Sequence, residues 1–219
     1  AIYTYKLLKN LGYKPVFLTR GYGGLLKGPI EVKDRHDFNN VGDEALLLNK
    51  IGPTIVSKDR SLGAKLIEKH EDNFNVIIMD DGLQNYQLEQ DIKFLLVDKN
   101  LKFGNEFCIP AGPLREPIDQ SLIRIDAIVL TGNNNKDADF NNVHNKTIFN
   151  SKVKTIKSPK IKNEKLLAFC GLANSNKFYE TLKENGFNVT STKSFPDHYE
   201  YKNEDIDKLI SEANKQNLK

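Results

Sequence analysis

Short apolar runs alternate with amphipathic segments along most of the chain. The runs are rich in β-branched and aliphatic residues, and several are apolar on both faces, as strands buried in a parallel sheet should be. They occupy residues 16–20, 54–58, 76–80, 93–98 and 126–131. Helical patterns such as GDEALLLNKI and SLGAKLIEKHE separate several of them. This alternation predicts an α/β fold with a doubly wound, mainly parallel sheet.

The pattern changes near residue 131. Residues 131–146 are polar and rich in asparagine and predict a loop, and the alternation in TIFNSKVKTIKSPKIK then predicts an extended or hairpin connection. Another strand, helix and strand pattern follows. We therefore expect a core domain over residues 1–148 and a smaller carboxyl-terminal α/β domain over residues 149–219, with a hinge near 149–163.

Both ends of the chain lie in helical patterns. The segment AIYTYKLLKNL has helical spacing from its first residue, and Gly12 stands where a glycine ends many helices. The chain closes with DIDKLISEANKQNLK, an amphipathic helix pattern with no strand after it. We expect the chain to be a fragment of a longer protein.

Composition narrows the class of protein. With 39% hydrophobic and 28% charged residues among 219, the chain can bury a core. The net charge of +3 is too small to indicate nucleic-acid binding. Cys108 and Cys170 are far apart and have no second ligand at metal spacing, so neither zinc nor a disulfide framework is expected. The lack of a disulfide framework fits a reducing cytosol. No run is long enough to span a membrane and no signal peptide is visible, so we expect the fragment itself to be soluble.

Two adjacent aspartates, Asp80 and Asp81, end the third apolar run. An isolated DDG is most often a turn or a cap. Two neighbouring carboxylates repel each other, however, unless a cation or donors neutralise them, and an aspartate after an apolar strand holds Mg²⁺ in Walker-B sites. The segments TRGYGG, VGDE and PAGPLREP also lie in loops or at helix starts where a doubly wound sheet builds a site.

A magnesium–phosphate site needs a phosphate-binding loop, and the pattern G-x-x-x-x-G-K-[ST] is not present in the chain. GYGGLLKGP is rich in glycine, but its lysine does not follow a glycine and no helix follows Pro29. A Walker A segment is therefore expected before Ala1, since the opening helix leads directly into a strand as the helix after a P-loop does.

An ordered set of motifs resembles the tetraacyldisaccharide 4′-kinases, a family that phosphorylates the lipid A precursor. The motifs are TRGYGG, VGDEALLL, DRSLGA, IIMDDGLQNYQLEQDI, VDKNLKFGNEFCIPAGPLREP, FCGLANSNKFYETLKENGF and FPDHYEY. The resemblance covers nearly the whole chain and implies a P-loop kinase core with a smaller second domain. It also implies ATP and Mg²⁺ as cofactors and an acylated glucosamine disaccharide 1-phosphate as substrate.

The same resemblance suggests the catalytic and metal-binding residues. Asp43 looks like the general base for the sugar hydroxyl and His198 like the residue that orients it, while Asp80 and Asp81 look like the Walker-B pair. From the residues alone, Asp43 is equally a carboxylate favoured at a helix N-terminus. His198, between Asp197 and Tyr199, reads as a surface histidine.

The substrate-binding residues implied by the family are Arg20, Glu44, Gln84, Arg115 and Glu116. A guanidinium binds phosphate through two hydrogen bonds, which suits the two arginines. The alternative for Arg115 and Glu116 is a structural ion pair in a loop. The histidine usual after the glutamine is replaced by Asn85, so a role for position 85 stays open.

Other classes of function remain open. One is another P-loop small-molecule kinase or a ligase similar to dethiobiotin synthetase, and the other is a non-catalytic remnant of the fold. The family implies work at the cytoplasmic face of the bacterial inner membrane, so a membrane surface is an expected partner; nucleic acid is not, and we expect a monomer. Without a P-loop, the fragment itself is expected to be weak or inactive, because phosphoryl transfer depends on positioning and electrostatics.

Overall fold

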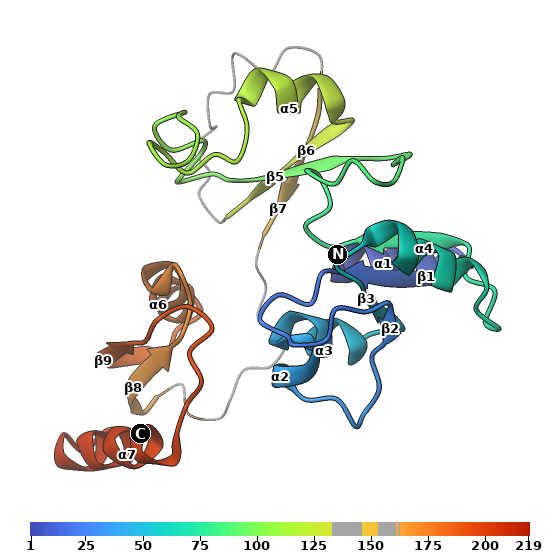
Figure 1. Cartoon of the computed structure of the whole chain (residues 1–219). Coiled ribbons are helices and arrows are strands. Elements are labelled where there is room, and N and C mark those ends of the chain that lie inside the picture. Colours follow the sequence, from blue (N-terminus) through green and yellow to red (C-terminus); the bar gives the residue numbers. More distant parts are fainter. Residues whose placement is uncertain (133–145, 153–160, 162) are drawn as a thin grey trace. The chain divides into compact units, whose positions relative to one another are not determined.

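The computed structural model describes residues 1–132, 146–152, 161 and 163–219. The chain divides into two compact units, residues 1–152 and 153–219 (Figure 1). The boundary expected at residue 148 falls within a strand that runs from Thr147 to Ser151. Within the expected hinge, residues 153–160 and 162 lie outside the described residues.

The first unit alternates strands and helices. Its elements are α1 (Ile2–Asn10), β1 (Pro15–Thr19), β2 (Ile30–Glu31), α2 (Phe38–Val41), α3 (Asp43–Asn49), β3 (Thr54–Val56), α4 (Arg60–Glu68), β4 (Val76–Met79), β5 (Phe94–Asp98), α5 (Ile118–Arg124), β6 (Ala127–Thr131) and β7 (Thr147–Ser151). The five strands expected from the sequence form as β1, β3, β4, β5 and β6, each within two residues of its predicted limits.

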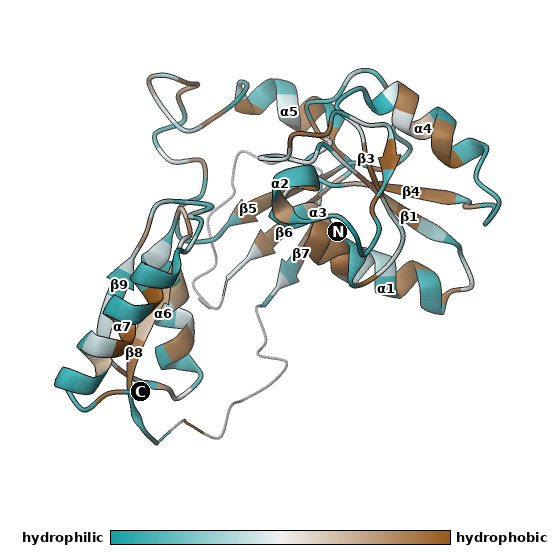
Figure 2. Cartoon of the chain, turned by 60° about the horizontal axis from the view of Figure 1, so that its bottom comes forward, coloured by the Kyte–Doolittle hydropathy of each residue, from teal (hydrophilic) through white to brown (hydrophobic). Residues whose placement is uncertain are grey.

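The first sheet has the strand order β2-β3-β1-β4, and β1 pairs in parallel with both β3 and β4. Every residue of β1 is buried, and Val16, Phe17 and Leu18 have no exposed surface. The reason is that β1 is an inner strand whose two faces meet different clusters. Phe17 packs with Tyr5 of α1, while Val16 and Leu18 pack with Ile67 of α4. Figure 2 shows brown strands in this sheet and mixed brown and teal helices.

The second sheet has the order β5-β6-β7, with both pairs parallel. Its inner strand β6 carries the buried core residues Ile128 and Leu130. Of the segment expected to be an extended or hairpin connection, residues 147–151 form β7, which pairs in parallel with β6 and so does not form a hairpin with it. This pairing makes β7 a strand of the first unit, and residues 153–160 and 162 lie outside the described residues.

The second unit is built around a parallel pair of strands. Its elements are β8 (Lys165–Cys170), α6 (Ser175–Glu184), β9 (Asn188–Ser194) and α7 (Asn203–Lys215). The strands β8 and β9 pair in parallel, and α6 connects them and packs on them through Tyr179. The strand, helix and strand pattern of the sequence is therefore present as a βαβ unit.

Two of the apolar runs form strands that are only partly covered. Among the described residues, β4 and β5 each pair with one neighbour and lie at the edge of a sheet, unlike the fully buried strands that several of the runs predict. As a result β4 has one buried residue, Ile78, and β5 has one, Val97. An apolar run indicates a strand but not its place in the sheet.

The mixed α/β fold with parallel sheets is the one that the sequence predicts. None of the helices in the described residues combines the length and the apolar character that crossing a membrane requires.

Candidate active site

The carboxyl ends of β1, β3 and β4 meet at one edge of the first sheet, because these strands are parallel. The residues that follow them are Arg20, Ser57 and Asp80. The backbone amide of Ser57 donates to the Thr19 carbonyl at 3.0 Å, and that of Asp80 donates to the Leu18 carbonyl at 3.2 Å. The three loops therefore start side by side.

Glycines bring the loop after β1 against the turn before α3. Gly42 has a φ of +84°, and a Cβ there would lie 2.2 Å from the carbonyl oxygen of Tyr22. A Cβ at Gly24 would lie 2.7 to 2.8 Å from backbone atoms of residues 40–42. The amide of Leu25 donates to the carbonyl of Asn39 at 2.8 Å. The TRGYGG and VGDE motifs thus form one packed surface at this edge of the sheet.

Asp43 is the first residue of α3, directly after Gly42. Its Oδ1 accepts from the backbone amide of Glu44 at 2.8 Å, and both carboxylates lie in the first turn, where the helix dipole favours negative charge. This is the arrangement of a helix N-terminal carboxylate. Because Gly42 packs against Gly21 and Tyr22, Asp43 also lies next to the loop that carries Arg20.

Asp81 is held in an uncommon conformation beside Arg115. Its φ is +51°, a left-handed value that costs energy in a residue with a Cβ. Nη1 of Arg115 lies 2.7 and 3.0 Å from the two carboxylate oxygens of Asp81. Both side chains are more than half exposed. The pair joins two of the predicted motifs, DDGLQN and PLREP.

Arg60 is a residue of this edge that the sequence did not single out. It is 4% exposed, and its guanidinium donates to the carbonyls of Ser57 and Asp80, each at 3.2 Å. Burial lowers the pKa of Arg60, the charge of Arg20 lowers it further, and Asp81 and Asp80 raise it. The charges of Arg20, Asp80 and Asp81 thus all act on Arg60 at this edge of the sheet. The only signal in the sequence was the motif DRSLGA, which reads as a helix start.

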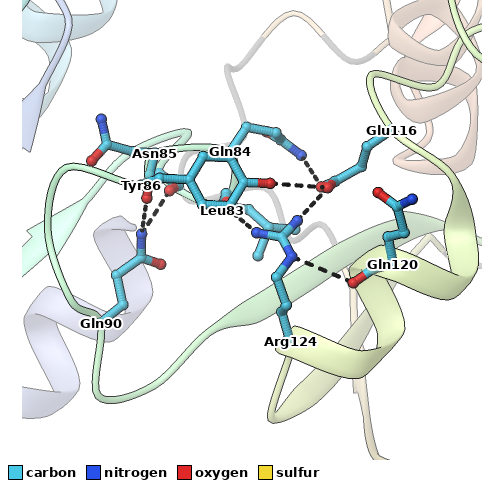
Figure 3. Close-up of polar contacts among 9 residues, drawn as sticks. Leu83, Gln84, Asn85, Tyr86, Gln90, Glu116, Gln120 and Arg124 are labelled. Atoms are coloured by element: carbon cyan, nitrogen blue, oxygen red, sulfur yellow. Dashed lines mark hydrogen bonds and ion pairs between the residues drawn. The ribbon is translucent and has the colours of Figure 1, made fainter.

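Gln84 and Glu116 meet in a polar cluster with Arg124 (Figure 3). Gln84 Nε2 donates to Glu116 Oε1 at 3.0 Å, and the other carboxylate oxygen forms an ion pair with Arg124. Burial alone would raise the pKa of Glu116, but hydrogen bonds from Gln84 and Ser121 and the charge of Arg124 outweigh it and hold the pKa below its usual value. Arg115 and Glu116 thus each form an ion pair, Arg115 with Asp81 and Glu116 with Arg124.

His198 belongs to the second unit. It has a φ of +54°, and its Nε2 lies 3.8 Å from Asp197 Oδ2. Asp197 also accepts, through Oδ1, a hydrogen bond from the amide of Ala173 at 2.9 Å. Its neighbours Phe195, Tyr199 and Tyr201 stack edge to face or tilted against one another. The FPDHYEY turn is therefore tied down within its own unit, whereas Asp43 belongs to the other unit.

The pair Asp80 and Asp81 suits a magnesium ion bound together with a phosphate. Within the described part of the chain, no group of three or more His, Cys, Asp or Glu side chains could hold a metal ion. Mg²⁺ does not need one, since it usually takes one or two carboxylates and completes its shell with water and substrate phosphates. Two adjacent carboxylates at a strand end fit that demand.

Comparison with known proteins gives a consistent result. A family model described as "Tetraacyldisaccharide-1-P 4'-kinase" matches residues 1–219. A tetraacyldisaccharide 4'-kinase of Paramagnetospirillum magneticum is 43% identical over 207 residues, which cover 92% of this chain and 62% of that protein. One from Bartonella quintana is 36% identical over 219 residues, covering 97% of this chain and 63% of that protein.

A solved structure agrees with these relatives. The crystal structure of the "apo" form of LpxK from Aquifex aeolicus in complex with ATP has a TM-score of 0.70 and 29% identity to this chain, and the match covers 92% of this chain and 67% of that one. The chain spans 62 to 63% of the length of the two curated relatives.

Proposed function

The chain belongs to the tetraacyldisaccharide-1-P 4'-kinase family, and we propose that the protein carrying it transfers the γ-phosphoryl group of ATP to the 4′ hydroxyl of an acylated glucosamine disaccharide 1-phosphate. The observation that carries the proposal is the match of the family model along the whole chain. ATP as phosphoryl donor is supported by the related LpxK, which was solved in complex with ATP. An acylated substrate makes a membrane surface the place of reaction.

In this proposal, side chains of the chain divide the parts of the reaction among them. Asp43 accepts the proton of the 4′ hydroxyl as its oxygen attacks phosphorus, so that the new P–O bond forms while the bond to ADP breaks. Arg20 and Arg115 contact phosphate or sugar oxygens, with Glu44, Gln84 and Glu116 as further substrate-binding residues. His198 orients Asp43.

Asp80 and Asp81 would hold Mg²⁺. When bound, this ion neutralises charge on the phosphate oxygens. Arg115 pairs with Asp81 at 2.7 Å and so keeps its carboxylate at the site, while Arg60 fixes the Asp80 backbone through its carbonyl. Preorganised charges of this kind lower the barrier because they need no rearrangement during the reaction.

A direct assay tests the proposal. The protein that carries this chain is incubated with Mg²⁺, ATP labelled in the γ-phosphate and tetraacyldisaccharide 1-phosphate in detergent micelles, and the lipid product is separated. We expect label in a bisphosphorylated disaccharide, and Asp43→Asn should abolish it. Label transfer to other small hydroxyl compounds but not to the lipid would favour a different small-molecule kinase. Normal folding with no transfer would favour a non-catalytic protein.

A further inference from the structure

Arg124 ends helix α5 and makes more contacts than a helix-terminal cation needs. A basic residue in the last turn is favoured by the helix dipole, and its side chain then usually extends into water. The side chain of Arg124 is only 25% exposed. Its guanidinium instead reaches the loop that follows Asp80 and Asp81, far from α5 in the sequence.

The guanidinium uses its separate donors for separate acceptors (Figure 3). Nη1 donates to the carbonyl of Leu83 at 3.2 Å, Nη2 pairs with Oε2 of Glu116, and Nε lies 3.4 Å from the carbonyl of Gln120. The group also lies over the ring of Tyr86, with its Cζ 4.9 Å from the ring centroid. A lysine has no planar fork and could not meet these acceptors together.

The partners of Arg124 lie next to the residues proposed for phosphate and metal. Leu83 follows Asp81 and Gly82, and Glu116 follows Arg115, whose guanidinium pairs with Asp81. Gln90 closes the same loop from within by donating to the carbonyls of Gly82 and Asn85, at 2.9 and 3.0 Å. Arg124 thus connects the DDGLQN loop to the PLREP loop, in addition to the Asp81–Arg115 pair and the Gln84–Glu116 hydrogen bond.

We propose that Arg124 is a positioning residue that holds Asp81 and Arg115 in register by bracing Leu83 and Glu116. Its role in turnover rests on the function proposed above. The contacts of Arg124 with Leu83 and Glu116, called the brace below, do not depend on that function. Besides its proposed contact with substrate, Glu116 links Gln84 to Arg124. The guanidinium touches no reacting atom and works through the two loops.

The test compares Arg124→Lys, Arg124→Gln and Glu116→Gln with Arg35→Gln, which changes an exposed arginine before α2. Misplacing reacting groups by a fraction of an ångström lowers kcat, so we expect both Arg124 variants to lose about 10- to 100-fold in kcat with KM for ATP within about 3-fold. Because Arg124 and Glu116 act as a unit, the Arg124→Gln/Glu116→Gln double variant should lose little more than the worse single variant. A wild-type kcat for Arg124→Lys would show that charge alone is required and would overturn the proposal.

Hydrogen–deuterium exchange provides a readout that does not depend on the activity. Backbone amides of residues 82–90 should exchange faster in both Arg124 variants, whereas amides of residues 165–194 and the whole Arg35→Gln variant should match wild type. Unchanged exchange in residues 82–90 would overturn the brace whatever the kinetics show. Faster exchange with unaltered kcat would overturn the positioning role. If the wild-type protein does not phosphorylate the disaccharide, faster exchange still supports the brace and only the proposed reaction fails.

Discussion

At the candidate site, single charged residues are stabilised by partners of opposite charge or by backbone carbonyls. Asp81 adopts a left-handed backbone conformation that favours glycine, and its carboxylate faces Arg115. Arg60 is buried, and the carbonyl of Asp80 is one of its acceptors. Strained residues and buried charges of this kind are concentrated at functional sites, where the surrounding structure maintains them.

Removal of the charge of Asp81 should lower the kinase activity strongly while changing the free energy of unfolding little. The Asp81–Arg115 pair is 66% and 58% exposed, and exposed pairs contribute at most about 1 kcal/mol, so Asp81→Asn should change the free energy of unfolding by less than that. Loss of a metal-binding carboxylate should nevertheless lower Mg²⁺-dependent turnover by about 100-fold or more. Urea unfolding and the lipid kinase assay measure the two effects, with Asp34→Asn as an exposed control. Full turnover in Asp81→Asn and in Asp80→Asn would remove both from the metal site.

The carboxyl of Glu116 should make stability depend on pH. Its pKa in the folded protein lies below the usual 4.5, so its stabilising contribution is complete above about pH 4.5 and is lost as the pH falls through the folded pKa. Glu116→Gln lacks this titration. The free energy of unfolding of wild type should therefore fall toward that of Glu116→Gln below pH 4.5. A difference in the free energy of unfolding that stays constant from pH 7 to pH 3 would contradict the lowered pKa of Glu116. As a control, the exposed Glu68→Gln should show the same pH dependence as wild type.

Sequence reasoning at the residue scale succeeded where a motif follows a strand. Asp80 and Arg20 could be located because their strands are recognisable and parallel strands end at one edge. Arg124 could not be, since its acceptor at Leu83 is 41 residues away and only the fold joins them. Arg60 could not be singled out within DRSLGA either, because burial of a charge has no local signature in the sequence.

Among the elements, the turn between α2 and α3 depends on close backbone contact. Gly42 lies between the two helices, where the carbonyl of Tyr22 leaves no space for a side chain. A capping box between Asp37 and Asn40 starts α2 just before it. These features set the position from which Asp43 starts α3.

Replacing Gly42 should therefore damage the fold at that turn. Gly42→Ala combines a φ of +84° with a Cβ placed 2.2 Å from a backbone oxygen. Gly12→Ala is the matched control, since Gly12 has a φ of +88° but nothing within 4 Å of its Cβ position. The control should lose about 1–2 kcal/mol from the left-handed backbone alone, and Gly42→Ala clearly more. Equal losses of the two variants in urea unfolding would show that the turn can relax.

The extent of each strand followed from its apolar run, whereas the pairing of strands did not. Five strands were predicted within two residues. The two-residue β2 is too short to produce a pattern, and β7 lies in a segment whose alternation predicted an extended or hairpin connection. Pairing depends on partners distant in sequence, so the apolar runs could not indicate that β4 and β5 are less covered than β1.

At the scale of the whole molecule, the proposed mechanism draws on two units. Asp43 belongs to the unit of residues 1–152 and His198 to the unit of residues 153–219. The family resemblance made them a pair, while composition and periodicity alone gave each of them an ordinary structural explanation. Cooperation between the two residues is therefore a hypothesis about the working enzyme, and it needs a measurement of coupling.

A double-mutant cycle measures that coupling. If His198 orients Asp43 during proton removal, Asp43→Ala should lower kcat by about 100-fold or more, and His198→Ala should lower it too. Once the base is gone, its orienting partner has nothing left to position, so the double variant should lose much less free energy of activation than the sum of the single losses. The control cycle pairs Asp43→Ala with His70→Ala, a histidine beside Glu31 and Asp72, and its losses should add. Additive losses for Asp43 and His198 as well would mean that the two residues act independently, and the orienting role of His198 would have to be abandoned even if the kinase activity is found.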